Sequence, residues 1–268
     1  MRAALACAAL LGPAVGSAQP TVASINLCTD QLVLTVAAPE QILSLSWLSA
    51  DPEESMLAAA ASAFPLNYGT AEELLRFDAE VVVAGSETSL FTRQLLRRLG
   101  TRVIEIEPAI SLADIARNLE QVGTALGREA AAASAIAAMR ARASALGARS
   151  AGALRSAVVV RPGGFTIGRQ TLAFELISLA GLANSIAELD RWGSLSIETL
   201  LRADPDFVVI TRYRSGEASL ANSFLGHPAL AALDGGPAVL TVAARHFACG
   251  VPESLDAAAA LLAQMARL

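Results

Sequence analysis

The stretch TAEELLRFDAEVVV at residues 70–83 returns 126 residues later as SIETLLRADPDFVVI at residues 196–210. Each copy begins with a hydroxyl residue, Thr70 or Ser196, of the type that caps the first turn of a helix. A Leu-Leu pair, an acidic turn and a run of apolar, mainly β-branched residues follow, which predicts a short helix and then a buried strand. In the first copy Glu73 also completes a capping box. One supersecondary unit is used twice, which predicts two lobes of similar build.

Strands and helices alternate around each copy. In the first half we expect strands at 22–27, 41–46, 81–84 and 102–106, and helices from 29 to 39, from Asp51 onward with Pro52 at its first position, and at 91–99. In the second half we expect strands at 156–161, 207–211 and 239–242, and helices at 172–180, 197–202, 228–233 and 254–267. This alternation is typical of parallel, doubly wound sheets, so the predicted fold class is α/β.

Two long helical runs, 111–126 and 128–146, lie between the halves, and the second is rich in alanine and arginine with almost no helix breaker. Such a helix is either a stiff spacer between lobes or an ordinary packed crossover helix, and the two interpretations are compatible. The expected organisation is an N-terminal α/β lobe at 19–127, a single interlobe helix at 128–150 and a C-terminal α/β lobe at 151–268.

Residues 1–18 have the features of a secretory signal peptide. After Arg2 no charge appears until Asp30, residues 3–11 are apolar, and small residues precede a predicted cleavage after Ala18. The rival interpretation is a membrane anchor, but this apolar run is too short to cross a bilayer. Cys7 would leave with the signal, whereas Cys28 and Cys249 would stay in an oxidising compartment, either as one disulfide or as two buried thiols.

The composition excludes several classes of function. The chain of 268 residues has 20 arginines and no lysine, so it can form neither a Schiff base nor a Walker phosphate loop. With two histidines it cannot build a site of three, and two cysteines make a cysteine-only metal site improbable. The net charge of −5 argues against a nucleic-acid partner. No Gly-x-Ser-x-Gly or Gly-x-Gly-x-x-Gly motif occurs where an enzyme would need it, so we expect neither catalysis nor a resident cofactor or metal.

Ligands of such sheets bind at the carboxyl ends of the strands, which predicts a cleft between the two lobes. The loops that follow the expected strands supply the candidates Asn26, Trp47, Tyr68, Ser86 and Glu87 from the first half, and Arg161, Phe165, Trp192, Arg212, Tyr213 and His246 from the second. Both tryptophans and both tyrosines of the chain fall in these loops, which favours a planar or ring-rich ligand over simple loop anchoring. Arg161 and Arg212 could pair with acidic groups of the ligand or be solvated strand ends.

The chain resembles periplasmic substrate-binding proteins of the ABC importer class for vitamin B12, ferric siderophores and haem. The resemblance rests on VASINL at 22–27, on both copies of the repeat, on GRQT at 168–171 and on LAGLAN at 179–184, where Leu182 departs from the family's usual glycine. It implies two Rossmann-like lobes joined by one long helix, and a monomer in the periplasm. Such a protein would capture a metal chelate and deliver it to an inner-membrane ABC permease.

The resemblance also implies roles for single residues. Glu72 and Glu198, at equal positions of the repeat, match the glutamates with which the family docks onto permease arginines, although an acid in a first turn also complements a helix dipole. Trp192 matches a tryptophan that faces the ligand in some relatives. A disulfide between the two remaining cysteines would tether the lobes. His246 could ligate the metal of a bound haem or corrinoid, or be a plain loop residue, while His227 is interpreted as a turn residue.

Two other classes of function remain as alternatives. One is a secreted ligand-binding scaffold or sensor with the same fold, which would lack a permease partner. The other is a secreted hydrolase, which the missing nucleophile motifs disfavour.

Overall fold

The structure is a computed structural model, and it describes residues 19–150, 152, 154–186, 188–213, 228 and 238–268. The first half of the chain, called lobe one below, is built on a parallel five-stranded sheet in the order β3-β2-β1-β4-β5. Its strands are β1 (Val22–Ser24), β2 (Ile42–Ser46), β3 (Leu66–Asn67), β4 (Val81–Gly85) and β5 (Arg102–Ile106). All residues of β4 are buried, as expected for an inner parallel strand covered by helices.

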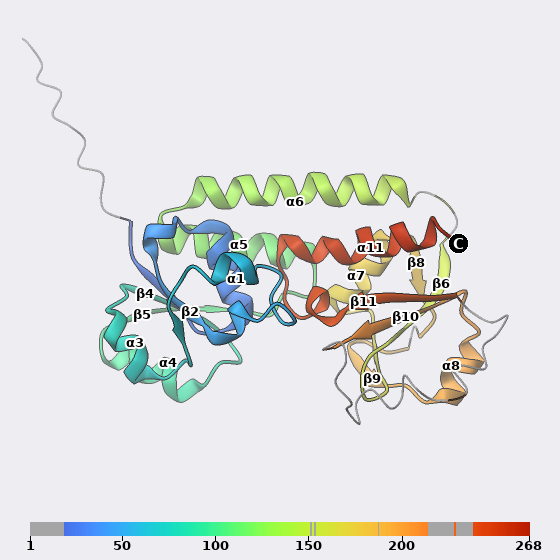
Figure 1. Cartoon of the computed structure of the whole chain (residues 1–268), viewed down its shortest axis with the longest axis horizontal. Helices are drawn as coiled ribbons and strands as arrows, with labels where there is room; N and C mark the ends of the chain where they lie inside the picture. Colours follow the sequence, from blue (N-terminus) through green and yellow to red (C-terminus); the bar gives the residue numbers. More distant parts are fainter. Residues whose placement is uncertain (1–18, 151, 153, 187, 214–227, 229–237) are drawn as a thin grey trace, which may run out of the picture.

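The helices of lobe one pack against this sheet (Figure 1). They are α1 (Leu27–Val36), α2 (Ala58–Ala61), α3 (Ala71–Phe77), α4 (Leu90–Arg98) and α5 (Leu112–Leu126), with 3-10 turns at Pro39–Gln41 and Trp47–Ala50. Helix α1 begins two residues before its expected start, because the Asn26 side chain caps it by accepting a hydrogen bond from the Cys28 amide at 2.9 Å. The preceding strand therefore ends at Ser24 and not at 27.

The helix predicted from Asp51 onward does not form there, and that prediction is wrong. Residues 52–54 form turns, and the next helix, α2, is a single turn further along the chain. The carboxylate of Asp51 accepts a hydrogen bond from the Glu53 amide at 2.9 Å, which closes a turn at the place where a helix would have had to propagate.

Lobe two contains a parallel four-stranded sheet in the order β11-β10-β6-β8 and a separate antiparallel pair, β7 and β9. The strands are β6 (Arg155–Val160), β7 (Phe165–Ile167), β8 (Leu182–Asn184), β9 (Trp192–Ser194), β10 (Phe207–Arg212) and β11 (Ala238–Ala243). The helices are α7 (Leu172–Leu179), α8 (Ile197–Ala203) and α11 (Leu255–Met265), with 3-10 turns at Ala244–Phe247 and Pro252–Ser254. His227 and most of the helix expected at 228–233 lie outside the described residues.

The repeat is confirmed down to its backbone. Thr70 and Ser196 each accept a hydrogen bond from the amide three residues later, at 3.3 and 3.1 Å. Helices α3 and α8 both have seven residues, and each ends at an aspartate in the left-handed region, Asp78 with φ of 50° and Asp204 with φ of 39°. Among the described residues these are the only non-glycine residues with positive φ. Aspartate tolerates this conformation better than most side chains, so the acidic turn is what ends both helices.

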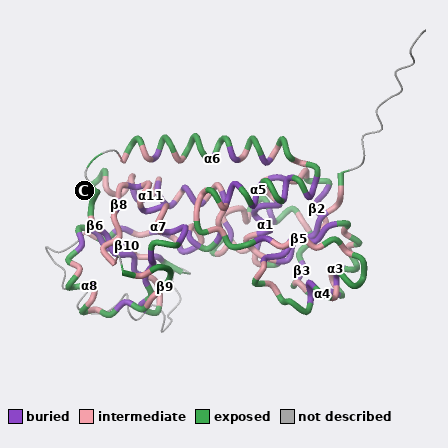
Figure 2. Tube along the Cα trace, turned by 180° about the vertical axis from the view of Figure 1, so that it is seen from behind, coloured by how far each residue is buried: buried purple, intermediate pink, exposed green. Residues whose placement is uncertain are grey.

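Helix α6 (Glu129–Arg149) runs along the top of the molecule in Figure 1, above α5 of lobe one and α11 of lobe two. Its buried residues Ala132, Ile136, Met139 and Leu146 recur at helical spacing and face these helices, while its other face is largely exposed (Figure 2). The spacer and packed-helix interpretations therefore both hold for α6.

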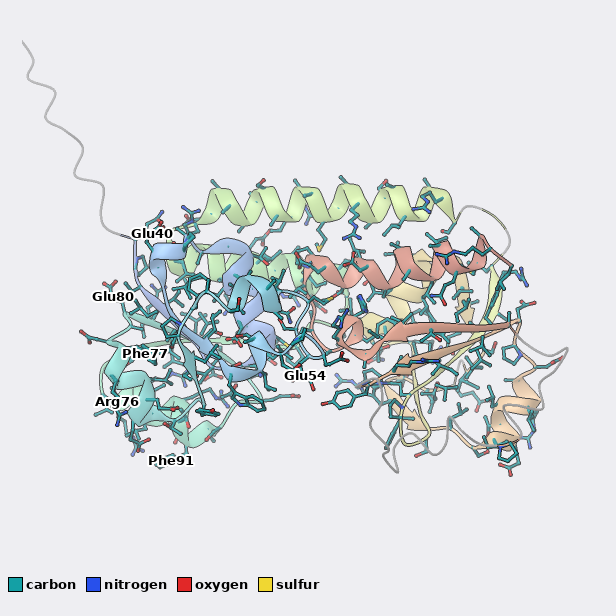
Figure 3. All side chains as sticks on the ribbon, in the orientation of Figure 1. Glu40, Glu54, Arg76, Phe77, Glu80 and Phe91 are labelled. Atoms are coloured by element: carbon teal, nitrogen blue, oxygen red, sulfur yellow. A yellow bond between two sulfur atoms is a disulfide. The ribbon has the colours of Figure 1, made fainter. Side chains whose placement is uncertain are left out.

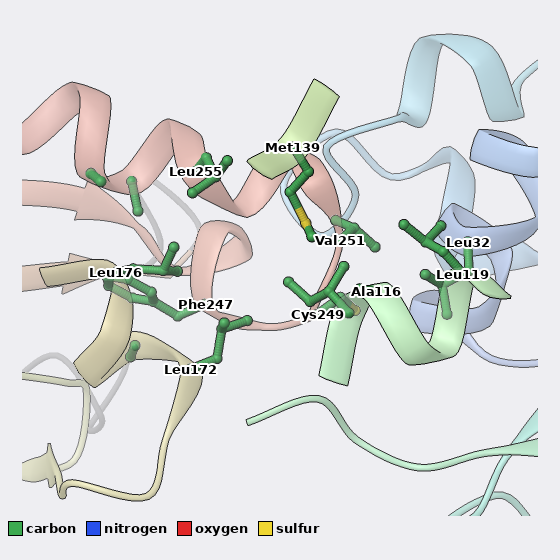
Figure 4. Close-up of a cluster of buried hydrophobic side chains, with 14 of the residues drawn as sticks. Leu32, Ala116, Leu119, Met139, Leu172, Leu176, Phe247, Cys249, Val251 and Leu255 are labelled. Carbon is green, nitrogen blue, oxygen red and sulfur yellow. The ribbon is translucent and has the colours of Figure 1, made fainter. Parts of the chain in front are cut away.

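One hydrophobic core continues through both lobes. Figure 4 shows Leu32 and Leu119 of lobe one, Leu172 of lobe two, and Met139 of α6 as members of the same cluster. Val251, in the loop before α11, lies between the two groups of side chains. Because packed interiors resist deformation, this shared core predicts that the lobes move little relative to each other.

A disulfide joins Cys28, at the start of α1, to Cys249, which lies in the loop before α11, with their Cα atoms 5.0 Å apart. The two residues are separated by 221 positions in the chain and belong to different lobes. Gly250, next to Cys249, passes so close to lobe one that an added Cβ would come within 2.4 Å of the Ala109 Cβ. A covalent bond and a tight backbone approach thus fasten the lobes near their junction.

Candidate functional site

The carboxyl ends of the two sheets face each other across the gap between the lobes. Trp47 directly follows β2 and Tyr68 directly follows β3 in lobe one. In lobe two, Arg161 follows β6 and Tyr213 follows β10. Because all strands within each main sheet are parallel, each sheet presents these loops along one edge. The strand-end prediction therefore selects the loops that border the gap.

Lobe two holds a cavity of about 450 Å³ at this edge. It is lined by Arg161, Pro162, Phe165, Trp192, Tyr213 and Ala244. The pairing of β7 with β9 brings Phe165 and Trp192 to the same region, with Ile167 opposite Trp192 in register. The rings of Phe165, Trp192 and Tyr213 are each 46–50 % exposed, so they offer open faces to a ligand. Four of the eleven cleft residues predicted from the sequence, Arg161, Phe165, Trp192 and Tyr213, meet in this cavity.

Arg161 is the charged residue of the cavity lining, and its Cζ lies 4.3 Å from the ring centroid of Trp192. The guanidinium thus lies over the indole ring in a cation–π contact. Partial burial lowers the pKa of Arg161 from its usual value, but an arginine keeps its charge at neutral pH. No described carboxylate forms an ion pair with it. A half-buried, pre-oriented cation of this kind suits a carboxylate or phosphate group of a ligand.

Trp47 and Tyr68 form a second aromatic group on lobe one. Their ring centroids lie 6.2 Å apart with an interplanar angle of 31°. Trp47 is 45 % exposed and Tyr68 is 72 % exposed. A tyrosine left this open at a cleft edge is unusual for a residue that only anchors its own loop, so the pair is suited to contact a ring-shaped ligand.

Two contacts cross the gap beside these aromatic groups. The Tyr213 hydroxyl donates a hydrogen bond to the Glu54 carboxylate of lobe one. Arg245 Nη1 of lobe two donates a hydrogen bond of 2.8 Å to the carbonyl oxygen of Pro52. Figure 3 shows Glu54 at the inner edge of lobe one, facing lobe two. The loop that begins at Trp47 therefore touches the wall of the lobe-two cavity.

Several predicted cleft residues lie elsewhere. Arg212, the last residue of β10, is exposed and does not line the cavity, because successive residues of a strand point to opposite sides. His246 lies in a 3-10 turn with Nδ1 3.1 Å from the Ala243 carbonyl oxygen, and burial lowers its pKa. Asn26 serves as the α1 cap, and Ser86 and Glu87 border a small pocket of about 140 Å³ next to the disulfide.

The candidate docking residues Glu72 and Glu198 lie in the first turns of α3 and α8, and both are exposed. The two helices lie on different lobes, on the side of the molecule opposite α6 (Figure 1). The neighbouring Glu73 departs from the expected capping box. Its carboxylate accepts hydrogen bonds from the Thr70 hydroxyl and from the amide of Tyr68, two residues before the cap.

Sequence reasoning missed Asp30 and Asn67, which are both fully buried. Asp30 is hydrogen-bonded to Ser46, the residue before Trp47, and Asn67 directly precedes Tyr68. Asp30 had a sequence signal, since it is the only charged residue between Arg2 and Glu40 and falls in an apolar helix. Asn67 had none. Glu54 was assigned to a helix, and its contact with Tyr213 joins residues 159 positions apart.

Among the described residues, no group of three or more histidine, cysteine, aspartate or glutamate side chains is arranged to hold a metal ion. A metal that arrives inside a ligand needs fewer donors. Tyr68 offers a phenol oxygen and His246 an imidazole nitrogen, and both donor types occur as axial ligands of haem iron.

A family model described as periplasmic binding protein matches residues 22–239. The chain belongs to this family. The periplasmic binding proteins are solute-binding proteins and not enzymes, and this member has their two-lobed architecture. No curated protein matches the chain significantly.

Solved structures of periplasmic binding proteins share the fold. The haem-binding protein HutB of Vibrio cholerae has a TM-score of 0.76 at 19% identity, covering 92% of this chain and 98% of its own. A haem-binding protein from Pseudomonas aeruginosa has a TM-score of 0.74 at 22% identity, covering 92% of each chain. The vitamin B12-binding protein BtuF of Vibrio cholerae has a TM-score of 0.67 at 17% identity, covering 93% of this chain and 98% of its own. These likenesses establish the fold and leave the ligand to be argued from the site.

In the part of the chain that the structure describes, no helix has both the length and the apolar character needed to cross a membrane.

Proposed function

We propose that this protein captures a planar metal chelate with acidic arms, with haem as the leading candidate, and delivers it to an inner-membrane ABC permease from the periplasm. The observation that carries the proposal is the pair of aromatic groups at the facing sheet edges. Trp47 and Tyr68 stand on lobe one, and Trp192 with Phe165 stands on lobe two. Two aromatic walls favour a flat, ring-shaped ligand, because ring faces stack on one another.

The charge of the site supports an acidic ligand. Arg161 is already stacked on Trp192 and carries its charge into a mostly apolar cavity. A guanidinium in such surroundings binds a carboxylate more strongly than one in open water, because less solvent screens the pair. Haem has a flat ring and carboxylate arms and so matches both features. Corrinoids and ferric siderophores are the other ligand classes bound by the proteins that this chain resembles, and they are larger or less planar than haem.

Tyr68 is our candidate for the residue that coordinates the metal of the ligand. Its ring is the most exposed of the cleft aromatics, and phenol oxygen is a donor that ferric haem accepts. His246 is less suited to this role, because its ring is partly buried against the Ala243 carbonyl.

The proposed periplasmic location rests on the signal features of residues 1–18 and on family membership. Delivery to a permease rests on the exposed, repeat-related Glu72 and Glu198. Cell fractionation should recover the protein in the periplasm with Gln19 as its first residue.

The experiment that tests the proposal is titration of the exported protein with haem, cyanocobalamin and a panel of ferric siderophores, followed by absorbance and tryptophan fluorescence. We expect haem to bind at 1:1 and to quench both tryptophans. Tyr68→Phe should shift the haem absorption bands, because the ring remains and the oxygen donor is lost, while Tyr213→Phe should leave the band positions unchanged. Tight binding of another chelate would replace haem as the ligand. If no chelate binds, the proposed function is wrong and a scaffold or sensor role is favoured.

A further inference from the structure

We propose that a buried polar network centred on Asp30 and Asn67 fixes the backbone beneath Trp47 and Tyr68, and that Asp30 and Asn67 are therefore positioning residues for the ligand-binding face of lobe one. The inference rests on the proposed function in one respect, namely that this aromatic pair contacts the ligand. The network itself is a feature of the folded chain.

The network lies where three adjacent parallel strands end. Ser24 is the last residue of β1, Ser46 of β2 and Asn67 of β3, and all three are buried. Trp47 and Tyr68 are the next residues after two of these strand ends. Any shift of the last strand residue would therefore move the attached aromatic side chain directly.

Asp30, in the first turn of α1, holds the residue before Trp47. Its carboxylate accepts hydrogen bonds from the Ser46 amide, at 3.1 Å, and from the Ser46 hydroxyl. The Ser46 carbonyl in turn accepts a hydrogen bond of 2.6 Å from the hydroxyl of Ser49. The amide, hydroxyl and carbonyl of Ser46 are thus all engaged, which leaves little freedom for the peptide that leads into Trp47.

Asn67 holds the chain on both sides of Tyr68. Its Nδ2 donates to the Ser24 carbonyl and to the Ser44 hydroxyl, both at 2.9 Å. Its Oδ1 accepts a hydrogen bond of 3.0 Å from the amide of Gly69, whose φ of +75° suits glycine. Tyr68 is therefore enclosed in a turn that the Asn67 side chain closes.

Glu73 completes the arrangement from outside. Glu73 lies in the first turn of α3. Its carboxylate accepts a hydrogen bond of 2.9 Å from the Tyr68 amide. The exposed Tyr68 ring thus stands on a backbone held by strand β3, by a buried amide and by a helix. Few contacts hold the ring itself, so the backbone sets its direction.

Burying a carboxylate and a primary amide costs more than burying apolar side chains of the same size, unless both are fully hydrogen-bonded. The same sheet also contributes fully apolar side chains to the core, among them Val22, Leu45 and Val81. In the described part of lobe two, Asn184 at the end of β8 makes a similar pair of contacts: its Nδ2 donates to the Ile167 carbonyl at 2.9 Å, and its Oδ1 accepts a hydrogen bond of 3.2 Å from the Ile186 amide. Asn184 is only partly buried, and the two residues after it, Ser185 and Ile186, are not aromatic. The buried Thr166 and Thr211 donate to the carbonyls of Val159 and Val160. In lobe one the network lies at the strand ends that lead directly into the exposed aromatic residues Trp47 and Tyr68, which points to positioning.

The test uses a Trp192→Phe background, in which Trp47 is the only tryptophan of the chain. Asp30→Leu and Asn67→Leu remove the polar partners at similar volume, whereas Asp30→Asn keeps a hydrogen-bonding group and serves as the matched control. In the ligand-free protein we expect the Leu variants to raise the acrylamide quenching of Trp47 and to lower its fluorescence anisotropy. Asp30→Asn should stay close to the parent. Circular dichroism selects the variants that fold, and Asn67→Asp replaces Asn67→Leu if that variant does not fold.

A double-mutant cycle separates positioning from general damage. We expect Asp30→Leu to weaken haem binding about tenfold when Trp47 is present and to have little effect in a Trp47→Ala background, because interacting residues are non-additive. Equal losses in both backgrounds would overturn the positioning role. Unchanged Trp47 quenching and anisotropy in all folded variants would overturn it as well. Absence of haem binding in the parent protein would contradict the proposed function only, since the fluorescence of the ligand-free protein tests the network on its own.

Discussion

The hydroxyl of Tyr213 in lobe two donates a hydrogen bond to the carboxylate of Glu54 in lobe one. Tyr213 also lines the lobe-two cavity, and Glu54 lies in the loop that starts at Trp47. The contact therefore spans the gap at the place where a ligand would sit between the aromatic groups. The hydrogen bond from Arg245, which lies in the 3-10 turn after β11, reaches Pro52 in the same lobe-one loop.

We expect Tyr213→Phe to increase the rate of ligand release. The variant keeps the ring in the cavity wall and removes the hydroxyl that reaches Glu54, so a hydrogen bond that joins the two lobes beside the cavity is lost. Its typical worth of about 1 kcal/mol corresponds to roughly a fivefold faster dissociation. Stopped-flow displacement measures this rate. Glu54→Ala should produce a similar change, and a normal release rate in both variants would contradict a closing role for the contact.

The disulfide predicts a different kind of result. Because Cys7 lies within the expected signal peptide, the exported protein should contain no free thiol under non-reducing denaturation. Replacing Cys28 and Cys249 together by serine should lower the free energy of unfolding by about 2–5 kcal/mol, as removal of a native disulfide commonly does. Mass analysis after alkylation, with and without reductant, checks the bond, and denaturant titration checks the stability. Two alkylated cysteines without reductant would show that the bond does not form in the exported protein.

Local signals explain why much of the fold was predictable. The hydroxyl caps Thr70 and Ser196 and the acidic turns lie within the segments they organise, so both helices and both following strands could be derived from short stretches. The pairing of β7 with β9 could not, because Phe165 and Trp192 are far apart in the chain and strand pairing depends on tertiary context. The turn at 52–54 was misassigned because Asp51 and Pro52 start turns as readily as helices.

The sequence identified part of the candidate site as well. Strand-end reasoning selected Arg161, Phe165, Trp192 and Tyr213, which line one cavity, and it placed Trp47 and Tyr68 among the candidates of lobe one, where the structure brings their rings together. It could not decide which way Arg212 points, since that depends on where the strand ends. The partners of Asp30 and Asn67 were equally hidden, because Ser46 is 16 positions from Asp30 and only the folded sheet brings them together.

Arg161 should set the preference for acidic ligands. We expect Arg161→Met to weaken binding of an anionic chelate by about tenfold or more, in the range of a hydrogen bond to a charged group. Arg161→Lys should recover only part of the loss, because an ammonium lacks the planar fork of donors with which a guanidinium binds a carboxylate. Arg212→Met is the matched control, since Arg212 has the same charge and lies outside the cavity lining. Equal losses from both Met variants, measured by titration at fixed ionic strength, would indicate a general charge effect in place of a site.

Asp30 should make stability depend on pH. Burial raises the pKa of Asp30 from 3.8 to about 7, although its hydrogen bonds act in the opposite direction. Between these values the folded protein keeps a proton that the unfolded chain releases, so the free energy of unfolding falls as pH rises from about 4 to about 7 and then levels off. The slope from this group is at most about 1.4 kcal/mol per pH unit. Urea titrations from pH 4.5 to 8 compare the parent with Asp30→Asn, and the difference in unfolding free energy should decline across this window. A difference independent of pH would mean that Asp30 does not titrate there.

The docking prediction concerns transport and not binding. Glu72 and Glu198 lie on α3 and α8, away from the cavity lining, so replacing both by alanine should leave ligand affinity unchanged. Uptake by cells should fall about tenfold or more, because the charged groups of the permease would lose the two carboxylates with which they pair. Glu120→Ala with Glu129→Ala is the matched control: both residues are exposed, the change in net charge is the same, and α5 and α6 lie on the opposite side of the molecule. We expect this control to transport normally. Normal uptake by the Glu72 and Glu198 double variant would remove the docking role, and equal losses in both pairs would assign the effect to net charge.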